Sequence, residues 1–139
     1  MDPGSYDYML TAEAKGIPLI HEMARQSGAK KYILARKGAK VYMPDPLCVE
    51  DQSITTAGTQ KLYLGRDDAD LIRGKRILIM DDVISTGGSL HALETLVQAA
   101  GGTVTDRVAV LAEGAAKDRK DIKFLAPLPV FNADGTVKS

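Results

Sequence analysis

The feature that most constrains the fold of this sequence is an unbroken apolar run, residues 76–80, which leads directly into Asp81 and Asp82. A continuous apolar strand of this kind is typical of a parallel sheet covered on both faces. A turn rich in glycine and hydroxyl residues follows, and the helical pattern of residues 89–100 comes after it. Because a strand that feeds a helix is half of a β-α-β unit, the segment predicts a mainly parallel sheet.

The rest of the chain repeats the alternation of strand and helix. Short apolar segments predict further strands at residues 6–11, 32–35, 104–112 and 122–125. Helical spacing of apolar residues, or a helical turn or two, is predicted at residues 16–28 and 67–73. A chain of 139 residues suffices for one core, so residues 1–139 are expected to form a single domain with a three-layer α/β/α architecture.

Residues 38–59 interrupt this alternation. The segment holds Pro44, Pro46, Gly58 and a cluster of serine and threonine, without a periodic apolar pattern. It predicts a long flexible loop within the domain, which could close over a bound substrate as a lid. Residues 61–64 are expected to be one arm of a hairpin at its far end.

Composition excludes several classes of function. The 18 Lys and Arg residues balance the 18 Asp and Glu residues, so the chain lacks the broad basic surface of a nucleic-acid binder. No apolar run approaches the roughly 18 residues that span a bilayer, so no membrane association is expected. One cysteine, Cys48, cannot form an internal disulfide, and we expect a cytoplasmic location. Zero net charge leaves self-association unopposed.

The turn after the two aspartates has the chemistry of an anion site. Gly87 and Gly88 let the backbone approach a ligand closely and adopt positive φ. Free N–H groups at the start of the following helix favour a negative charge. Ser85, Thr86 and Ser89 add hydroxyl donors.

The two acids predict a second kind of contact beside the anion. Asp81 and Asp82 would repel a phosphate, but they suit vicinal hydroxyls or a divalent metal next to it. The ligand implied is therefore a sugar phosphate with free hydroxyls. In the plainer alternative, Asp82 and Ser89 merely cap a turn and a helix.

These residues carry a family resemblance. Residues 77–89 resemble the 5-phosphoribosyl 1-pyrophosphate (PRPP) motif of type I phosphoribosyltransferases. Residues 10–18 are similar to the pyrophosphate loop of that family, and residues 32–37 to the next strand with its basic end. Residues 125–131 are similar to the C-terminal segment of adenine phosphoribosyltransferases, so the adenine phosphoribosyltransferase-like group is the nearest.

The resemblance implies roles for individual residues. Asp81 and Asp82 would contact the ribose hydroxyls, with Mg²⁺ near them and held mainly through PRPP. The residues that would wrap the 5-phosphate are Ser85, Thr86, Gly87, Gly88 and Ser89. Those that would contact pyrophosphate are Glu13, Ala14, Lys15 and Gly16, with a non-proline cis peptide at Glu13–Ala14. The cluster of Arg36, Lys37 and Lys40 after the strand would neutralise the departing pyrophosphate, unless these residues belong to an ordinary solvated loop. We expect Asp81, Asp82 and Lys37 to be catalytic.

The expected function is transfer of the phosphoribosyl group from PRPP to a purine-type base, adenine first, by a homodimer. The family carries tens of residues ahead of the first core strand as a hood over the base, and we expect most of such a hood to be missing here. Residues 56–58 stand where adenine enzymes carry Glu-Tyr-Gly, and Lys15 where arginine is common. Two alternatives stay open: a non-catalytic regulatory module that binds PRPP or a nucleotide, and a truncated, poorly active family member.

Overall fold

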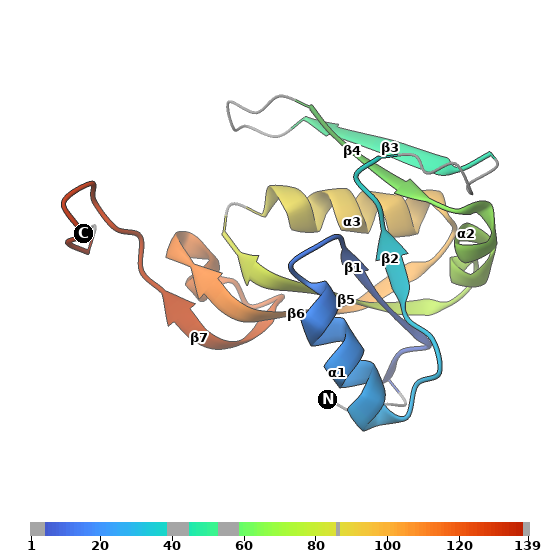
Figure 1. Cartoon of the computed structure of the whole chain (residues 1–139), viewed down its shortest axis with the longest axis horizontal. Coiled ribbons are helices and arrows are strands. Elements are labelled where there is room, and N and C mark those ends of the chain that lie inside the picture. Colours follow the sequence, from blue (N-terminus) through green and yellow to red (C-terminus); the bar gives the residue numbers. More distant parts are fainter. Residues whose placement is uncertain (1–4, 39–44, 53–58, 86, 138–139) are drawn as a thin grey trace.

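A five-stranded parallel sheet forms the centre of the molecule (Figure 1), in a computed structural model that describes residues 5–38, 45–52, 59–85 and 87–137. The strands lie in the order β2-β1-β5-β6-β7, and each adjacent pair is parallel. Their bounds are β1 (Tyr8–Ala12), β2 (Ile33–Ala35), β5 (Arg76–Ile84), β6 (Thr103–Glu113) and β7 (Lys123–Leu128). The expected mainly parallel sheet is confirmed, with the apolar strand β5 at its centre.

Helices cover both faces of the sheet. The helices are α1 (Ile17–Ser27), α2 (Arg66–Ile72) and α3 (Gly88–Ala99). Successive β5 side chains point to opposite faces, so Ile77 and Ile79 join the apolar cluster that contains α3, whereas Leu78 and Met80 join the cluster that contains α1. One unbroken apolar strand therefore supplies both interfaces of the three-layer α/β/α fold.

Strand β5 is longer than the sequence pattern indicates. The expected strand ends at Met80, but pairing with β6 continues through Asp81, Val83 and Ile84. Asp81 and Asp82 consequently lie within the strand, not after it. The reason is that β6 extends to Glu113 and offers parallel hydrogen-bonding partners along this whole length.

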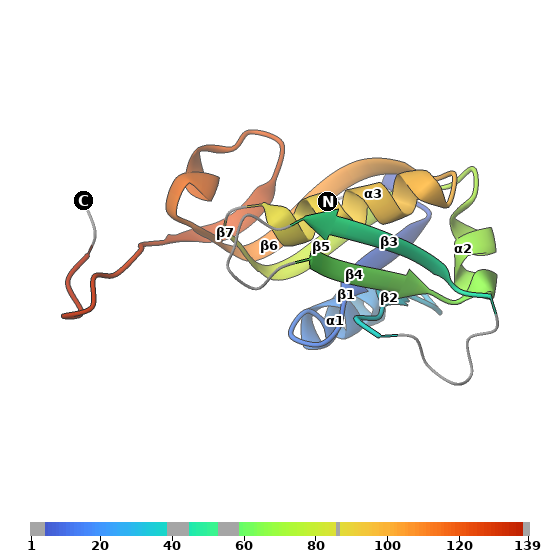
Figure 2. The same cartoon turned by 90° about the horizontal axis from the view of Figure 1, so that it is seen from above.

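An antiparallel hairpin occupies part of the segment expected to be loop. Strand β3 (Leu47–Gln52) pairs with β4 (Thr59–Leu64), so residues 47–52 of the predicted long flexible loop form a strand. The hairpin packs over α3 (Figures 1 and 2), where Leu62 and Leu64 are buried in the core. Strand β3 has no alternating apolar pattern in the sequence, whereas the hairpin arm predicted at residues 61–64 is confirmed as part of β4. The remainder of the expected loop, residues 39–44 and 53–58, lies outside the described residues.

The C-terminal end of the chain leaves the body of the fold. After β7, the chain extends away from the sheet (Figures 1 and 2) and folds back through a bridge between Phe131 and Val137. Leu125, Phe131 and Val137 are more than half exposed, at 85%, 55% and 58%. Within the described part of the chain, no helix has the length and apolar character needed to cross a membrane.

Candidate active site

A cavity of about 390 Å³ opens where the carboxyl ends of β1, β2 and β5 meet. Ligands of open parallel sheets bind at this edge, because the loops that leave neighbouring strands converge there. The cavity is lined by Ala12, Glu13, Ala14, Lys15, Lys37, Leu62, Asp81, Asp82, Val83 and Ser89. Residues predicted from three separate stretches of sequence are thus brought to one site.

The loop after β1 is fastened to the end of β2 by Glu13. The Lys37 backbone N–H donates to Glu13 Oε1 at 2.7 Å, and Arg36 Nη1 lies 3.3 Å from Glu13 Oε2. The Glu13 N–H in turn donates to the Ala35 carbonyl at 2.9 Å. The Glu13–Ala14 peptide is cis, as the resemblance implied. Lys15 and Lys37 line the cavity, whereas Arg36 is held against Glu13 outside the lining set.

Gly16 shapes the same loop without lining the cavity. The Thr11 hydroxyl, fully buried, donates to the Met80 carbonyl at 2.7 Å and so links β1 to β5. A Cβ atom on Gly16 would collide with Thr11 Oγ1. The chain can therefore turn from β1 into α1 over this buried hydroxyl only because residue 16 lacks a side chain.

Asp81 and Asp82 both line the cavity and are connected to each other. The Asp82 backbone N–H donates to Asp81 Oδ1 at 2.8 Å. Burial, followed by the interaction with the Asp82 side chain, raises the pKa of Asp81 to about 7, and the positive charge of Lys37 opposes this rise. Asp81 consequently changes charge near neutral pH, and cationic or hydroxyl groups of a ligand would favour its ionised form.

The turn between β5 and α3 encloses a second, smaller cavity of about 40 Å³ next to the first. Among its lining residues are Ser85, Gly87, Gly88 and Ser89. Three residues line both cavities, namely Asp81, Val83 and Ser89. Gly87 precedes α3 with φ of +87°, a conformation that residues with side chains rarely adopt. Thr86, the remaining predicted residue of this turn, lies outside the described residues.

The described protein groups could supply only some of the ligands of a bound metal ion. Across the described ranges, no group of three or more His, Cys, Asp and Glu residues is placed to hold a metal. Asp81 and Asp82 still offer carboxylate oxygens, the donors that Mg²⁺ prefers. Two carboxylates fit a Mg²⁺ ion whose other coordination positions are filled by oxygen atoms of a bound substrate and by water.

Sequence reasoning missed three residues of the main cavity, namely Ala12, Leu62 and Val83. Ala12 and Val83 adjoin predicted residues and could have been found from them. Leu62 could not have been found from the sequence, because a leucine gives no sign of a binding role there. It reaches the cavity only because β4 is joined to the end of β2. The Tyr63 N–H donates to the Arg36 carbonyl at 2.8 Å, and the Arg36 N–H donates to the Tyr63 carbonyl at 2.9 Å.

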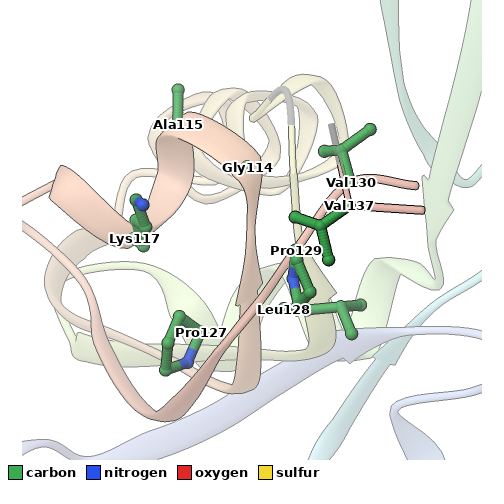
Figure 3. Close-up of a pocket in the computed structure, with 8 residues that line it drawn as sticks. All are labelled: Gly114, Ala115, Lys117, Pro127, Leu128, Pro129, Val130 and Val137. Atoms are coloured by element: carbon green, nitrogen blue, oxygen red, sulfur yellow. The ribbon is translucent and has the colours of Figure 1, made fainter. Parts of the chain in front are cut away.

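A separate cavity of about 450 Å³ lies at the carboxyl ends of β6 and β7 (Figure 3). It is lined by Gly114, Ala115, Lys117, Pro127, Leu128, Pro129, Val130 and Val137. These walls are mostly apolar, with Lys117 as the charged group among them. Because β5, β6 and β7 are parallel, this cavity and the aspartate pair open at the same edge of the sheet.

Comparison with known proteins relates this site to known chemistry. The model of the phosphoribosyl transferase domain family matches residues 2–134. The adenine phosphoribosyltransferase of Mycolicibacterium paratuberculosis is 42% identical over 97 residues, which are 70% of this chain and 50% of that protein. The hypoxanthine/guanine phosphoribosyltransferase of Methanotorris igneus is 32% identical over 117 residues, 84% of this chain and 60% of that protein.

A solved structure extends the match to three dimensions. The adenine phosphoribosyltransferase of Thermoanaerobacter pseudethanolicus superposes with a TM-score of 0.75 and 26% identity, covering 88% of this chain and 71% of that chain. Against the two curated relatives, this chain spans 50% and 60% of their length.

Proposed function

Since the chain belongs to the phosphoribosyltransferase family, we propose that it is a pentosyltransferase that moves the 5-phosphoribosyl group from PRPP to a purine-type base and releases pyrophosphate. Adenine is the base expected first, because adenine phosphoribosyltransferases are among the relatives. The observation that carries the proposal is the cavity in which Glu13, Lys15 and Lys37 face Asp81 and Asp82.

The 5-phosphate is assigned to the turn before α3. Backbone N–H groups at the start of a twelve-residue helix attract an anion, and Ser85 and Ser89 supply hydroxyl donors beside them. Gly87, with φ of +87°, gives the turn a conformation that a residue with a side chain rarely adopts. Both aspartates line the larger cavity beside this turn, where the hydroxyls of a ribose attached to the phosphate would meet them.

The pyrophosphate is assigned to the opposite wall of the larger cavity. Lys15 and Lys37 come from the ends of β1 and β2 and present cations to a ligand there. Glu13 does not oppose them with a free carboxylate, because its oxygens already accept from the Lys37 backbone and from Arg36. Lys37 is placed to stabilise the charge that develops on pyrophosphate as it departs.

Asp81 and Asp82 would hold the ribose between these two anions. Their carboxylates are the protein groups that would contact Mg²⁺, which supplies additional charge neutralisation for pyrophosphate when it is bound with PRPP. In the transfer, the bond between C1 of ribose and the pyrophosphate oxygen breaks with its electron pair going to pyrophosphate. A ring nitrogen of the base forms the new bond to C1 and gives up its proton to pyrophosphate or to solvent. The two aspartates hold C1 in place between the leaving group and the incoming nitrogen.

We assign the base to the neighbouring side of the sheet edge, where the 450 Å³ cavity provides apolar walls (Figure 3). A purine ring is flat and needs apolar cover on its faces, with a few polar groups at its edge. Leu128 and Val130 supply such cover, and the Lys117 ammonium could donate to a ring nitrogen or carbonyl.

Pyrophosphate release tests the proposal directly. PRPP and Mg²⁺ are mixed with the protein and with adenine, hypoxanthine, guanine or a pyrimidine base in turn. We expect base-dependent release with a purine, and a loss of about one to two orders of magnitude in kcat/KM for Asp81→Asn or Asp82→Asn. Binding of PRPP without release for any base would identify the non-catalytic module instead. Absence of both would overturn the proposed function.

We also propose that the protein forms a homodimer and that it works in the cytoplasm. The exposed side chains of Leu125 and Phe131 support self-association, because a second copy would remove them from water. The single thiol, Cys48, is free and exposed, which suits a reducing compartment.

A further inference from the structure

Arg119 lies against the turn to which the phosphate is assigned, although it is 32 residues away from Gly87 in the sequence. A Cβ atom built on Gly87 would lie 2.9 Å from Arg119 Nη1. The guanidinium therefore occupies the space that the side chain of residue 87 would fill. In the sequence, residues 117–121 are a run of charged residues of both signs with no sign of this contact, so the contact comes from the tertiary structure alone.

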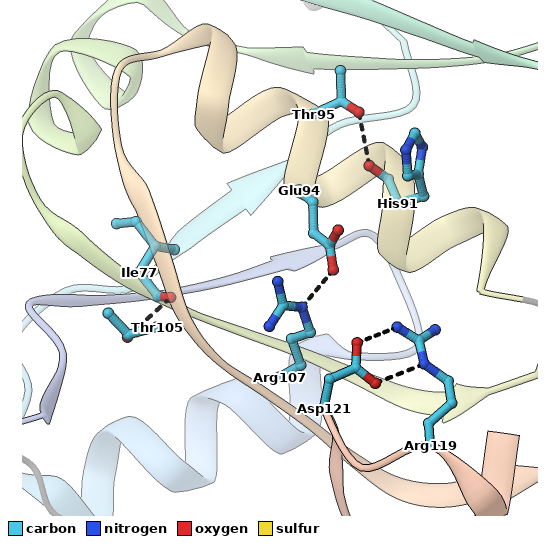
Figure 4. A network of polar contacts seen from close by, with 8 residues as sticks. All are labelled: Ile77, His91, Glu94, Thr95, Thr105, Arg107, Arg119 and Asp121. Atoms are coloured by element: carbon cyan, nitrogen blue, oxygen red, sulfur yellow. Dashed lines mark hydrogen bonds and ion pairs between the residues drawn. The ribbon is translucent and has the colours of Figure 1, made fainter.

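The orientation of the Arg119 side chain is fixed by Asp121. Arg119 Nε donates to Asp121 Oδ1 at 2.8 Å, and Nη2 donates to Asp121 Oδ2 at 2.5 Å (Figure 4). This two-bonded arrangement uses one edge of the guanidinium and directs Nη1 to Gly87. Hydrogen bonding to Asp121 also raises the pKa of Arg119, which keeps the group charged.

The other charges in the neighbourhood form a separate pair. Arg107 Nε donates to Glu94 Oε1 at 2.5 Å (Figure 4), and both side chains are largely buried, at 25% and 19% exposure. Glu94 on α3 attracts Arg119 as well, but its carboxylate is already bound to Arg107. Of the two arginines in this neighbourhood, Arg119 is therefore the one that lies against Gly87.

We propose that Arg119 is a positioning residue of the phosphate turn, which holds Gly87 in its left-handed conformation and adds a fixed positive charge beside the bound 5-phosphate. The inference rests on the proposed function, since that function places the phosphate at this turn. Arg119 acts from the side of Gly87 at which a side chain would stand, and the backbone N–H groups of the turn make the direct contacts. A charge held close to an anion site favours the dianionic form of a phosphate over the monoanionic form.

The test compares variants of two adjacent cations on the same loop. Arg119→Gln removes the charge next to Gly87, and Lys120→Gln removes an equal charge from an exposed neighbouring side chain. Ribose 5-phosphate binding is measured by calorimetry. We expect Arg119→Gln to weaken affinity about three- to tenfold and Lys120→Gln to leave it within about twofold. Arg119→Lys, which keeps the charge but loses the two-bonded geometry, should give an intermediate affinity.

A second readout separates positioning of a charge from plain structural support. Phosphorus NMR of bound ribose 5-phosphate follows the second ionisation of its phosphate. In Arg119→Gln, this ionisation should move to higher pH than in the wild type, while Lys120→Gln leaves it in place. Unchanged affinity in Arg119→Gln, or weaker affinity with an unchanged ionisation, would overturn the inference. Failure of the wild type itself to bind ribose 5-phosphate would overturn the proposed function first, and this inference with it.

Discussion

Asp81 combines a position needed for ligand binding with an environment that disfavours its charge. Burial is the main reason that its pKa is raised to about 7, from an ordinary value of 3.8. Between these two values the folded protein holds a proton that the unfolded chain has released. The free energy of unfolding therefore falls as pH rises from about 4 to about 7 through this group.

Replacing Asp81 with asparagine should remove this contribution. We expect Asp81→Asn to be more stable than the wild type at pH 8, by about 1–2 kcal/mol, and to differ little near pH 4. Urea unfolding at both pH values measures the difference, with Asp70→Asn, at an exposed position on α2, as the control. A gain of the same size at pH 4 and pH 8 would show that the carboxyl charge is not its cause.

Gly16 is required by a buried hydroxyl and not by its own backbone conformation. Its Cβ would collide with Thr11 Oγ1, so Gly16→Ala should destabilise the fold by about 1–3 kcal/mol. Adding Thr11→Ala to Gly16→Ala should recover part of that loss, because the collision is removed. Gly65→Ala, where a Cβ meets nothing within 4 Å, should change stability by less than about 1 kcal/mol. Strictly additive effects of the two substitutions would contradict the proposed collision.

At the scale of elements, the hairpin β3–β4 takes up part of the segment predicted to be a long loop, residues 47–52 and 59. Leu62 and Leu64 are buried, and Tyr63 exchanges two backbone hydrogen bonds with Arg36. The hairpin is therefore part of the core on one side and a wall of the candidate active site, through Leu62, on the other.

Hydrogen exchange should show this dual position. In the free protein, we expect amides of residues 61–64 to exchange slowly, in contrast to those of the exposed tail at residues 132–135. If the expected closure over substrate occurs, PRPP with Mg²⁺ should slow exchange further within residues 38–59. Exchange at residues 61–64 as fast as in the tail would contradict the packing of β4. Exchange at residues 38–59 that does not change on adding PRPP and Mg²⁺ would contradict the role of this segment as a lid.

At the scale of the whole molecule, the exposed apolar surface of strand β7 bears on assembly. Leu125 on β7 is 85% exposed, although it is a large apolar residue. If this surface is the interface of the proposed homodimer, light scattering should give twice the mass of one chain for the wild type. Leu125→Glu should shift the mass toward the monomer, because it would bury a charge at the interface.

A matched charge elsewhere provides the control for that experiment. Gln98→Glu, at an exposed position on α3, should keep the mass of the wild type. A monomeric wild type at the concentrations used for activity would contradict the proposed dimer. A dimer that persists in Leu125→Glu would place its interface on another face.

The sequence by itself determined the local units and the motif. Residues 77–89 predict a strand, a turn and a helix, and Gly28 ends α1 in a left-handed conformation as its position suggests. These predictions succeed because apolar periodicity, glycine freedom and helix ends depend on neighbours in the chain. Asp81 and Asp82 follow from the apolar strand that leads into them, and Lys37 from its place after another strand, whereas Glu13 and Lys15 were implied by the family resemblance. All five line one cavity, because the carboxyl ends of parallel strands lie at one edge of the sheet.

Only the tertiary structure decided how those units support one another. Glu13 reaches the backbone of Lys37 across 24 residues, and Arg119 reaches Gly87 across 32. Leu62 enters the cavity because β4 is joined to the end of β2, and β5 runs on through Asp81 because β6 is long enough to pair with it. Such contacts depend on the register of strands and the placement of loops, which are set by packing between distant segments and leave no periodic signal in the sequence.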